Sequence, residues 1–286
     1  MTGSPTDKKA AASQTTGRLR PPGGERGRAW VDARAGIGTL LLLILVTAPM
    51  VAVSAGRNLS FDSGTHRVMV VELYTSEGCS SCPPADAYLN SFAARPDLWT
   101  DFVPLAFHVD YWDYLGWRDR FAAPANDARQ RRYVALGRMS AVYTPAFVVN
   151  GRGWRPARRD AAPVPDQAAA PRLRVQLAGP RVEARLSHGA AGPRPLEFHL
   201  AVLGMGLHSH IRAGENRGRD ATHDFVVLAH TQHAGGGHRW STALPAVPAV
   251  AARRYALAAW VSRPGDPTPL QATGGYIPAS LVEKKR

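Results

Sequence analysis

The sequence of 286 residues predicts an α/β domain followed by a mostly β, sandwich-like domain, with a membrane segment before both. A strand–helix–strand–helix–strand pattern over residues 64–160 indicates the first domain. Short, often alternating apolar runs between Gly and Pro turns over residues 170–282 indicate the second. An uncharged apolar stretch over residues 36–56 predicts the membrane segment.

The N-terminal region carries export signals. Residues 1–35 form a basic tail rich in Gly, Pro, Ser, Thr and Arg, which buries too little apolar surface to order, so we expect disorder. Residues 36–56 are close to the length a helix needs to cross a bilayer, and the basic tail favours a cytoplasmic N-terminus. The small residues Val53–Gly56 also suit signal peptidase. Both an anchor and a cleaved signal stay open, and either places the domains in the periplasm.

The charge pattern argues against nucleic-acid binding. The net charge is +13, but a good part of it sits in the basic tail and in the last three residues. The remaining basic residues are spread out and lack interleaved aromatic residues. We therefore expect no nucleic-acid partner.

The first predicted domain opens with a strand and a helix. Residues 67–75 are short, apolar and β-branched, which is typical of a strand buried on both faces. A helix begins at Pro83, since proline fits the first helical turn and the following apolar spacing is helical. Cys79 and Cys82 thus lie at a strand-to-helix junction.

The pattern continues with two strands and a helix. Residues 102–112 predict a strand whose Pro104 favours an edge position or a late start. A helix follows, opened by Asn126 or Asp127. Pro145 then precedes the apolar strand Ala146–Val149, which Asn150–Gly151 ends with a turn.

The second predicted domain follows a linker over residues 156–171. Its runs are "RLRVQLA", "RVEARLSH", "LEFHLAVLGMG", "HDFVVLAHTQH" and "RYALAAWVSR". Helix signals are scarce there, and no repeat is apparent. This pattern of short runs between turns predicts a sandwich of antiparallel strands.

The two cysteines predict redox chemistry. Cysteines at i and i+3 can close into a disulfide with little backbone movement, so they can store two electrons. The helix N-terminus favours a thiolate at Cys79, which would be the attacking thiol. Cys82, further into the helix and less exposed, would resolve the mixed disulfide.

Other readings of the pair stay open. A structural disulfide without redox activity is possible in an oxidising compartment, although a disulfide that closes so small a loop adds little stability. Copper or zinc binding needs ligands beyond two thiolates, such as His108 or a histidine from the second domain. A non-catalytic interaction protein is a third alternative.

Two motifs carry a family resemblance. The segment "GCSSCPPAD" after a strand and the later "VYTPAFVVNG" resemble the thioredoxin superfamily. With "FHVDYWDYLGWRD", "ARQRRYV" and "GENRGRDATHDFVVL", residues 67–275 are similar to a bacterial family of exported thioredoxin-like proteins without an assigned function. The resemblance implies a thioredoxin-like fold, a cis Thr144–Pro145 bond and a Pro145 that faces the cysteines.

The resemblance also supplies candidate residues. Glu72 resembles the buried acid that takes a proton from the second cysteine, although it stands one residue too early and is equally suited to a surface. Gly78 and the Ser80–Ser81 pair depart from thioredoxin, so the direction of electron flow does not transfer. The candidate catalytic residues are Cys79, Cys82, Pro145 and Glu72, and the candidate substrate-binding residues are Ser80, Ser81, Tyr143, Thr144, His108 and Trp112.

Eight of the ten histidines fall in the second predicted domain. His208 and His210 would share a strand face and His230 and His233 a helical one, so a metal site is conceivable beside the simpler reading of scattered surface residues. The sequence as a whole predicts an exported thiol–disulfide oxidoreductase that acts on protein or small-molecule thiols, without a cofactor.

Overall fold

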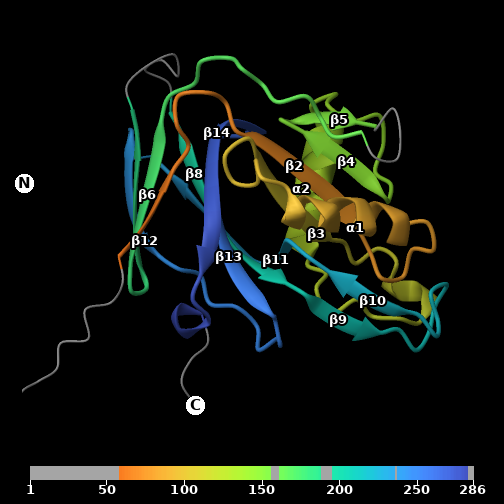
Figure 1. Ribbon diagram of the computed structural model, residues 1–286. Helices are drawn as coiled ribbons and strands as arrows, with labels where there is room; N and C mark the ends of the chain where they lie inside the picture. Colours follow the sequence, from red (N-terminus) through yellow and green to blue (C-terminus); the bar gives the residue numbers. More distant parts are fainter. Residues whose placement is uncertain (1–57, 156–160, 188–194, 236, 283–286) are drawn as a thin grey trace, which may run out of the picture. The chain divides into compact units, whose positions relative to one another are not determined.

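The computed structural model describes residues 58–155, 161–187, 195–235 and 237–282, which all belong to one compact unit over residues 53–286. The predicted disordered tail (1–35) and membrane segment (36–56) lie outside these residues. Within the described part, no helix is long and apolar enough to cross a membrane. The described residues form two α-helices and fourteen strands (Figure 1): α1 (Pro83–Asn90), α2 (Pro124–Ala135), β1 (Leu59–Asp62), β2 (Met69–Thr75), β3 (Phe102–His108), β4 (Ala146–Val149), β5 (Arg152–Trp154), β6 (Leu173–Ala178), β7 (Arg181–Leu186), β8 (Glu197–Met205), β9 (Leu207–His210), β10 (Asp220–His223), β11 (Val226–Ala234), β12 (Arg239–Ala243), β13 (Arg254–Arg263) and β14 (Asp266–Ile277).

The larger sheet has eight strands in the order β14-β13-β8-β11-β3-β2-β4-β5. Only β2 with β3 and β3 with β11 pair in parallel, and every other neighbouring pair in this sheet is antiparallel. The strands therefore come from both the early and the late part of the sequence.

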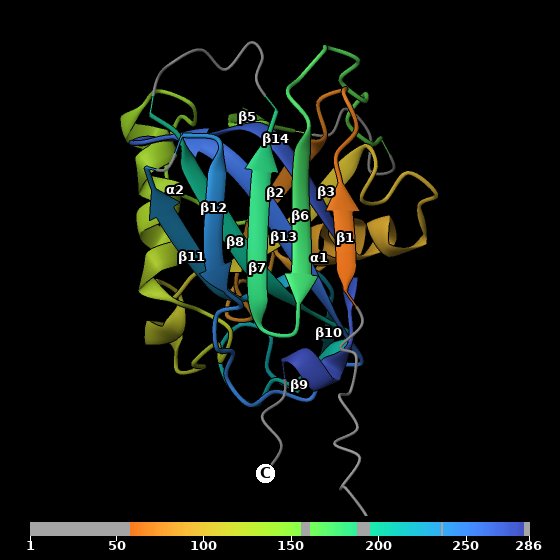
Figure 2. The same ribbon diagram turned by 90° about the vertical axis from the view of Figure 1, so that its left-hand side faces the viewer.

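The smaller sheet has the order β1-β6-β7-β12 and packs against one face of the larger sheet (Figure 2). Strand β6 alternates buried and exposed residues, as expected when one face meets a core and the other meets water. Its buried Leu173, Val175 and Leu177 join Phe198 of β8 and Leu257 of β13 in one apolar cluster. These two sheets form a β sandwich.

The two helices cover opposite faces of the larger sheet at β2, as the hydrogen bonds of two β2 side chains show. Glu72 and Tyr133 of α2 are hydrogen-bonded, whereas Thr75, three residues along β2, is bonded to Asp86 of α1. Successive strand residues point to opposite faces, so Glu72 and Thr75 face different sides of the sheet. Coverage on both faces explains why all seven residues of β2 are buried.

Several predicted elements are confirmed. The structure has the strand within residues 67–75, the helix beginning at Pro83, the strand beginning at Phe102 and the strand Ala146–Val149. Helix α2 begins at Pro124, two residues before the predicted opening at Asn126.

The predicted α/β, thioredoxin-like fold class is wrong. The protein is mostly β, with two short helices among the described residues and a predominantly antiparallel larger sheet. The sequence pattern predicts that the first sheet is complete within residues 64–160. In the structure β3 instead pairs through Ala106 with Val226 of β11, so the sheet continues into the later strands. The division into domains at residues 64–160 and 170–282 stays a prediction.

Candidate dithiol site

Cys79 and Cys82 occupy the short turn between β2 and α1. The backbone N–H of Cys79 donates to Ser76 at 3.1 Å, and that of Cys82 donates to Cys79 at 3.2 Å. Cys82 is the residue that caps the start of α1, and Pro83 and Pro84 form the beginning of its first turn. Both cysteines are free thiols, so the site is a reduced dithiol.

Both cysteines are buried, with 1% of Cys79 and 0% of Cys82 exposed. The sequence predicts that Cys79 is more exposed than Cys82, whereas the structure buries both. The difference arises from segments far away in the sequence: the Asn216 side chain donates to the carbonyl of Cys79 at 2.8 Å, and Trp112 lies tightly against Gly78. The residue next to the dithiol, Ser80, is exposed.

The surroundings of Cys79 favour its thiolate. Hydrogen bonding from the Cys82 thiol, and then from the hydroxyls of Ser81 and Thr144, lowers the pKa of Cys79 to about 6 although burial opposes this. The Ser81 oxygen lies 3.2 Å from the Cys79 sulfur. A large fraction of Cys79 is therefore ionised at neutral pH.

Trp112 orients one of these donors. Its indole Nε1–H donates to Thr144 Oγ1 at 2.7 Å, so the threonine oxygen is used as an acceptor and its own proton is free for the Cys79 sulfur. The Thr144–Pro145 bond is cis, which confirms the isomer implied by the resemblance. Thr144 and Trp112, two predicted substrate-binding residues, thus stand beside Cys79.

The surroundings of Cys82 favour its protonated thiol. Burial is the largest cause of a strongly raised pKa, and the neighbouring Cys79 and Asp86 charges raise it further. Thr75 lies within hydrogen-bonding reach of the Cys82 sulfur and donates its hydroxyl proton to Asp86 Oδ1 at 2.7 Å. Burial also raises the pKa of Asp86, which suits a carboxylate that accepts a proton.

The sequence reasoning missed Asp86, Thr75 and Asn216. A signal for Asp86 was present, because residues four apart on a helix share one face and Asp86 follows Cys82 by four. Asn216 lies in the "GENRGRD" motif, which pointed to no role by itself.

Glu72 lies away from the dithiol. Its carboxylate accepts two hydrogen bonds from Arg129, both at 2.8 Å, and one from Tyr133 at 2.6 Å. It faces α2, whereas Cys82 belongs to the side covered by α1. The structure therefore does not bring Glu72 together with the cysteines, and Asp86 is the acid that stands next to Cys82.

His108 belongs to a buried ionic cluster under α1. Its Nδ1 lies 2.6 Å from Asp119, and its ring lies 4.9 Å from that of His223, which in turn is 3.2 Å from Glu77. Burial disfavours charge on His108, but the Asp119 carboxylate outweighs this and raises its pKa. A cavity of about 500 Å³ lined by Glu77, Asp86 and His223 connects this cluster with the surface.

Other predicted residues border a second cavity. Ser81, Tyr143 and Pro145 line a largely apolar cavity of about 460 Å³, together with Tyr88 and Trp154. This cavity adjoins the dithiol turn through Ser81. Ser80, Thr144, Trp112 and His108 are absent from its lining, and His108 belongs instead to the buried ionic cluster.

The structure gives no added support to a metal centre. Among the described residues, no group of three or more His, Cys, Asp or Glu side chains could hold a metal ion. The dithiol itself would supply two ligands, fewer than a closed zinc site needs.

Residues 70–262 match the family model described as Protein of unknown function (DUF1223). The chain is similar to the crystal structure of protein AGR_C_4864 from Agrobacterium tumefaciens, with a TM-score of 0.51 and 23% identity over 77% of this chain and 98% of that one. A further match is HBP35 of Porphyromonas gingivalis, with a TM-score of 0.48 and 12% identity over 75% of this chain and 76% of that one. No curated protein matches the chain. The Agrobacterium likeness supports the fold alone.

Proposed function

This chain belongs to the DUF1223 family, whose function is unknown, and we propose from its dithiol site that it carries out thiol–disulfide exchange. Cys79 is the attacking thiol and Cys82 the resolving thiol. The observation that carries the proposal is the different surroundings of the two sulfurs: the Ser81 oxygen lies 3.2 Å from the Cys79 sulfur, where hydrogen bonds from Cys82, Ser81 and Thr144 favour a lowered pKa of about 6, whereas Cys82 is fully buried, which raises its pKa.

The exchange proceeds in two steps. The Cys79 thiolate attacks one sulfur of a substrate disulfide, forms a mixed disulfide and releases the other substrate sulfur as a thiolate. Cys82 then loses its proton and attacks the Cys79 sulfur, which closes the Cys79–Cys82 disulfide and releases the second substrate thiol. The dithiol thereby gives two electrons to the substrate.

The second step needs a proton acceptor for Cys82. Thr75 stands between the Cys82 sulfur and the Asp86 carboxylate, so the thiol proton passes to the threonine oxygen as the threonine proton passes to Asp86. Burial raises the pKa of Asp86, which makes its carboxylate a better proton acceptor. The cavity beside Asp86 connects this proton with solvent.

Access sets the substrate requirement. Because Cys79 is 1% exposed, a substrate sulfur reaches it only after a local movement of the residues that cover it. The apolar cavity lined by Ser81 and Pro145 adjoins this turn and offers room for the group attached to the substrate sulfur. A periplasmic location, predicted from the sequence, suits the cycle because disulfides persist there.

A trapping experiment tests the proposal. The Cys82→Ser variant of the full chain lacks the resolving thiol, so incubation with oxidised glutathione should accumulate a mixed disulfide on Cys79 that mass spectrometry detects. The matched Cys79→Ser variant, which retains the buried Cys82, should form no adduct. Equal labelling of both variants, or labelling of Cys82→Ser only in denaturant, would rule out exchange at this site.

A further inference from the structure

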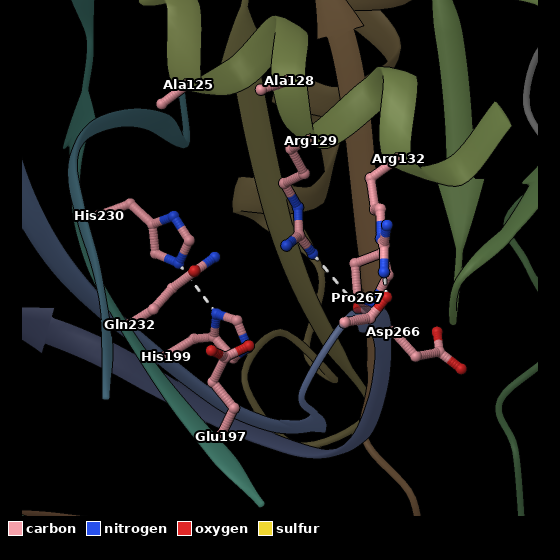
Figure 3. Close-up of a pocket in the computed structure, with 11 residues that line it drawn as sticks. Ala125, Ala128, Arg129, Arg132, Glu197, His199, His230, Gln232, Asp266 and Pro267 are labelled. Carbon is pink, nitrogen blue, oxygen red and sulfur yellow. Dashed lines mark hydrogen bonds and ion pairs between the residues drawn. The ribbon is translucent and has the colours of Figure 1, made fainter. Parts of the chain in front are cut away.

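A cavity of about 550 Å³ lies between α2 and the strands β8, β11 and β14 (Figure 3). Its lining includes six charged or polar side chains: Arg129 and Arg132 from α2, Glu197 and His199 from β8, His230 from β11 and Asp266 from β14. None of these residues lines the two cavities beside the dithiol. The cavity is therefore a separate candidate site.

Two stacked histidines form one wall. His199 Nδ1 lies 3.1 Å from His230 Nε2, and both rings stack on Trp260 with centroids 4.9 Å away. His199 is 1% exposed, and its Nε2 lies 2.8 Å from the Ser262 hydroxyl. The pair is held rigidly at the bottom of the cavity.

The partners of the pair assign its tautomers. The Ser262 hydroxyl donates to the Arg263 carbonyl at 3.4 Å, so its oxygen is left to accept from His199 Nε2–H, and the Glu197 carboxylate 3.4 Å from that nitrogen favours the same proton position. His199 Nδ1 then accepts from His230 Nε2–H. The lone pair of His230 Nδ1 remains for a partner in the cavity.

Two guanidinium groups line the same cavity as His230. Arg129 uses Nε and Nη2 to bind Glu72, Tyr133 and the Pro267 carbonyl, and Figure 3 shows its other terminal nitrogen turned toward His230. Arg132 donates through Nε to the Gly265 carbonyl at 2.8 Å and leaves the outer part of its guanidinium at the cavity.

The balance of charge favours an anion. Burial, and then the positive charge of Arg129, lowers the pKa of His230 to about 3 and that of His199 well below its usual range. Of the two acids, Asp266 pairs with Arg138 at 3.6 Å, and burial raises the pKa of Glu197. The positive charge of Arg129, which pairs with Glu72, is thus the largest charge effect on both imidazoles, and the nearest acid, Glu197, lies 3.4 Å from His199 Nε2.

We propose that this cavity binds a small organic oxyanion, a carboxylate or phosphate ester, between Arg129, Arg132 and His230, and that His230 takes up a proton on Nδ1 as the anion binds. An anion beside the imidazole offsets the repulsion from Arg129, so the protonated ring becomes a donor to the ligand. The cavity is larger than a single oxyanion group requires, which leaves room for a carbon skeleton.

Calorimetric titration of the full chain tests the proposal, with succinate, citrate and inorganic phosphate as probes and succinamide as the uncharged match to succinate. At least one anion should bind, succinamide should not, and the affinity should rise by up to about tenfold per pH unit from pH 8 to pH 6 because one proton is taken up. Titrations in two buffers of different ionisation enthalpy count that proton. Success of one probe over the others identifies a carboxylate or a phosphate ligand.

Three variants locate the binding. Arg132→Gln should weaken it about tenfold, since a charge-assisted hydrogen bond is lost. His230→Gln should remove the pH dependence, and Arg131→Gln, on the exposed side of the same helix, should change neither. Failure of all three anions to bind, binding that is indifferent to Arg132→Gln, or binding without proton uptake would overturn the proposal.

Discussion

Thr75 and Asp86 join the last residue of β2 to helix α1 through a hydrogen bond of 2.7 Å from the threonine hydroxyl to the carboxylate. The Cys82 thiol lies within reach of the same hydroxyl. The resolving thiol is therefore connected to a buried acid through one side chain, and this connection can be tested separately from the attack by Cys79.

Asp86→Asn should slow the closing of the Cys79–Cys82 disulfide about a hundredfold, the lower range for loss of a general base. The substitution keeps the oxygen that accepts from Thr75, so the fold is preserved. Stopped-flow measurement of glutathione release from the Cys79 mixed disulfide gives this rate. In the native protein the rate should rise with pH as Asp86 ionises, and a variant with an unaltered rate and pH profile would exclude Asp86 as the acceptor.

Thr144→Val should raise the pKa of Cys79 above about 6, because a hydrogen bond to its thiolate is lost. The Thr144→Ser variant keeps the hydroxyl and serves as the matched control. The pH dependence of carboxymethylation by iodoacetate, with the site identified by mass spectrometry, reports the pKa. Identical midpoints for the Val and Ser variants would mean that Thr144 does not stabilise the thiolate.

Glu72→Gln should destabilise the protein by about 3–5 kcal/mol, since Arg129 would be left as a buried charge without its partner. Urea unfolding at pH 7 measures the change, with Glu183→Gln on the exposed face of β7 as the control. Under conditions where the variant is folded, disulfide closing should keep its native rate. A strong loss of that rate would instead restore Glu72 as the acid that serves Cys82.

The stability of the protein should fall in acid partly through His199 and His230. Their folded pKa values lie below the usual 6.5, so below pH 6.5 the unfolded chain binds more protons than the folded one. Their contribution is complete above pH 6.5 and is lost as the pH falls toward about 3, at up to about 1.4 kcal/mol per pH unit for each histidine. Urea unfolding between pH 7 and pH 4 should show a shallower decline for His230→Gln than for the exposed His208→Gln.

Local patterns predicted the early strands and helices because those elements depend on nearby residues. The run at residues 67–75 is apolar on both faces, and Pro83 suits a first helical turn. The pairing of Ala106 with Val226 had no such signal, since it joins residues 120 positions apart and depends on how the later strands fold. Because of this pairing, the strands predicted for an α/β domain share one sheet with the later strands.

The sequence also predicted part of the dithiol site. Spacing and helix position singled out Cys79 and Cys82, and the resemblance supplied Pro145. The burial of Cys79 was not predictable, because Asn216 and Trp112 reach it from other segments. The sequence pattern placed His230 and His233 on one helical face, whereas both lie on strand β11. The contact of His230 with His199 depends on the register of β8 and β11.

Strand β2 supports both candidate sites from its two faces. Thr75 leads to the resolving thiol, and Glu72 holds the arginine that borders the oxyanion cavity. A substitution in this strand should therefore be assayed at both sites, because disulfide closing reports on the Thr75 face and anion binding reports on the Glu72 face. Substitutions at exposed residues, such as Ser81 at the dithiol site and Arg132 at the oxyanion cavity, keep the thiol-exchange and anion-binding assays independent.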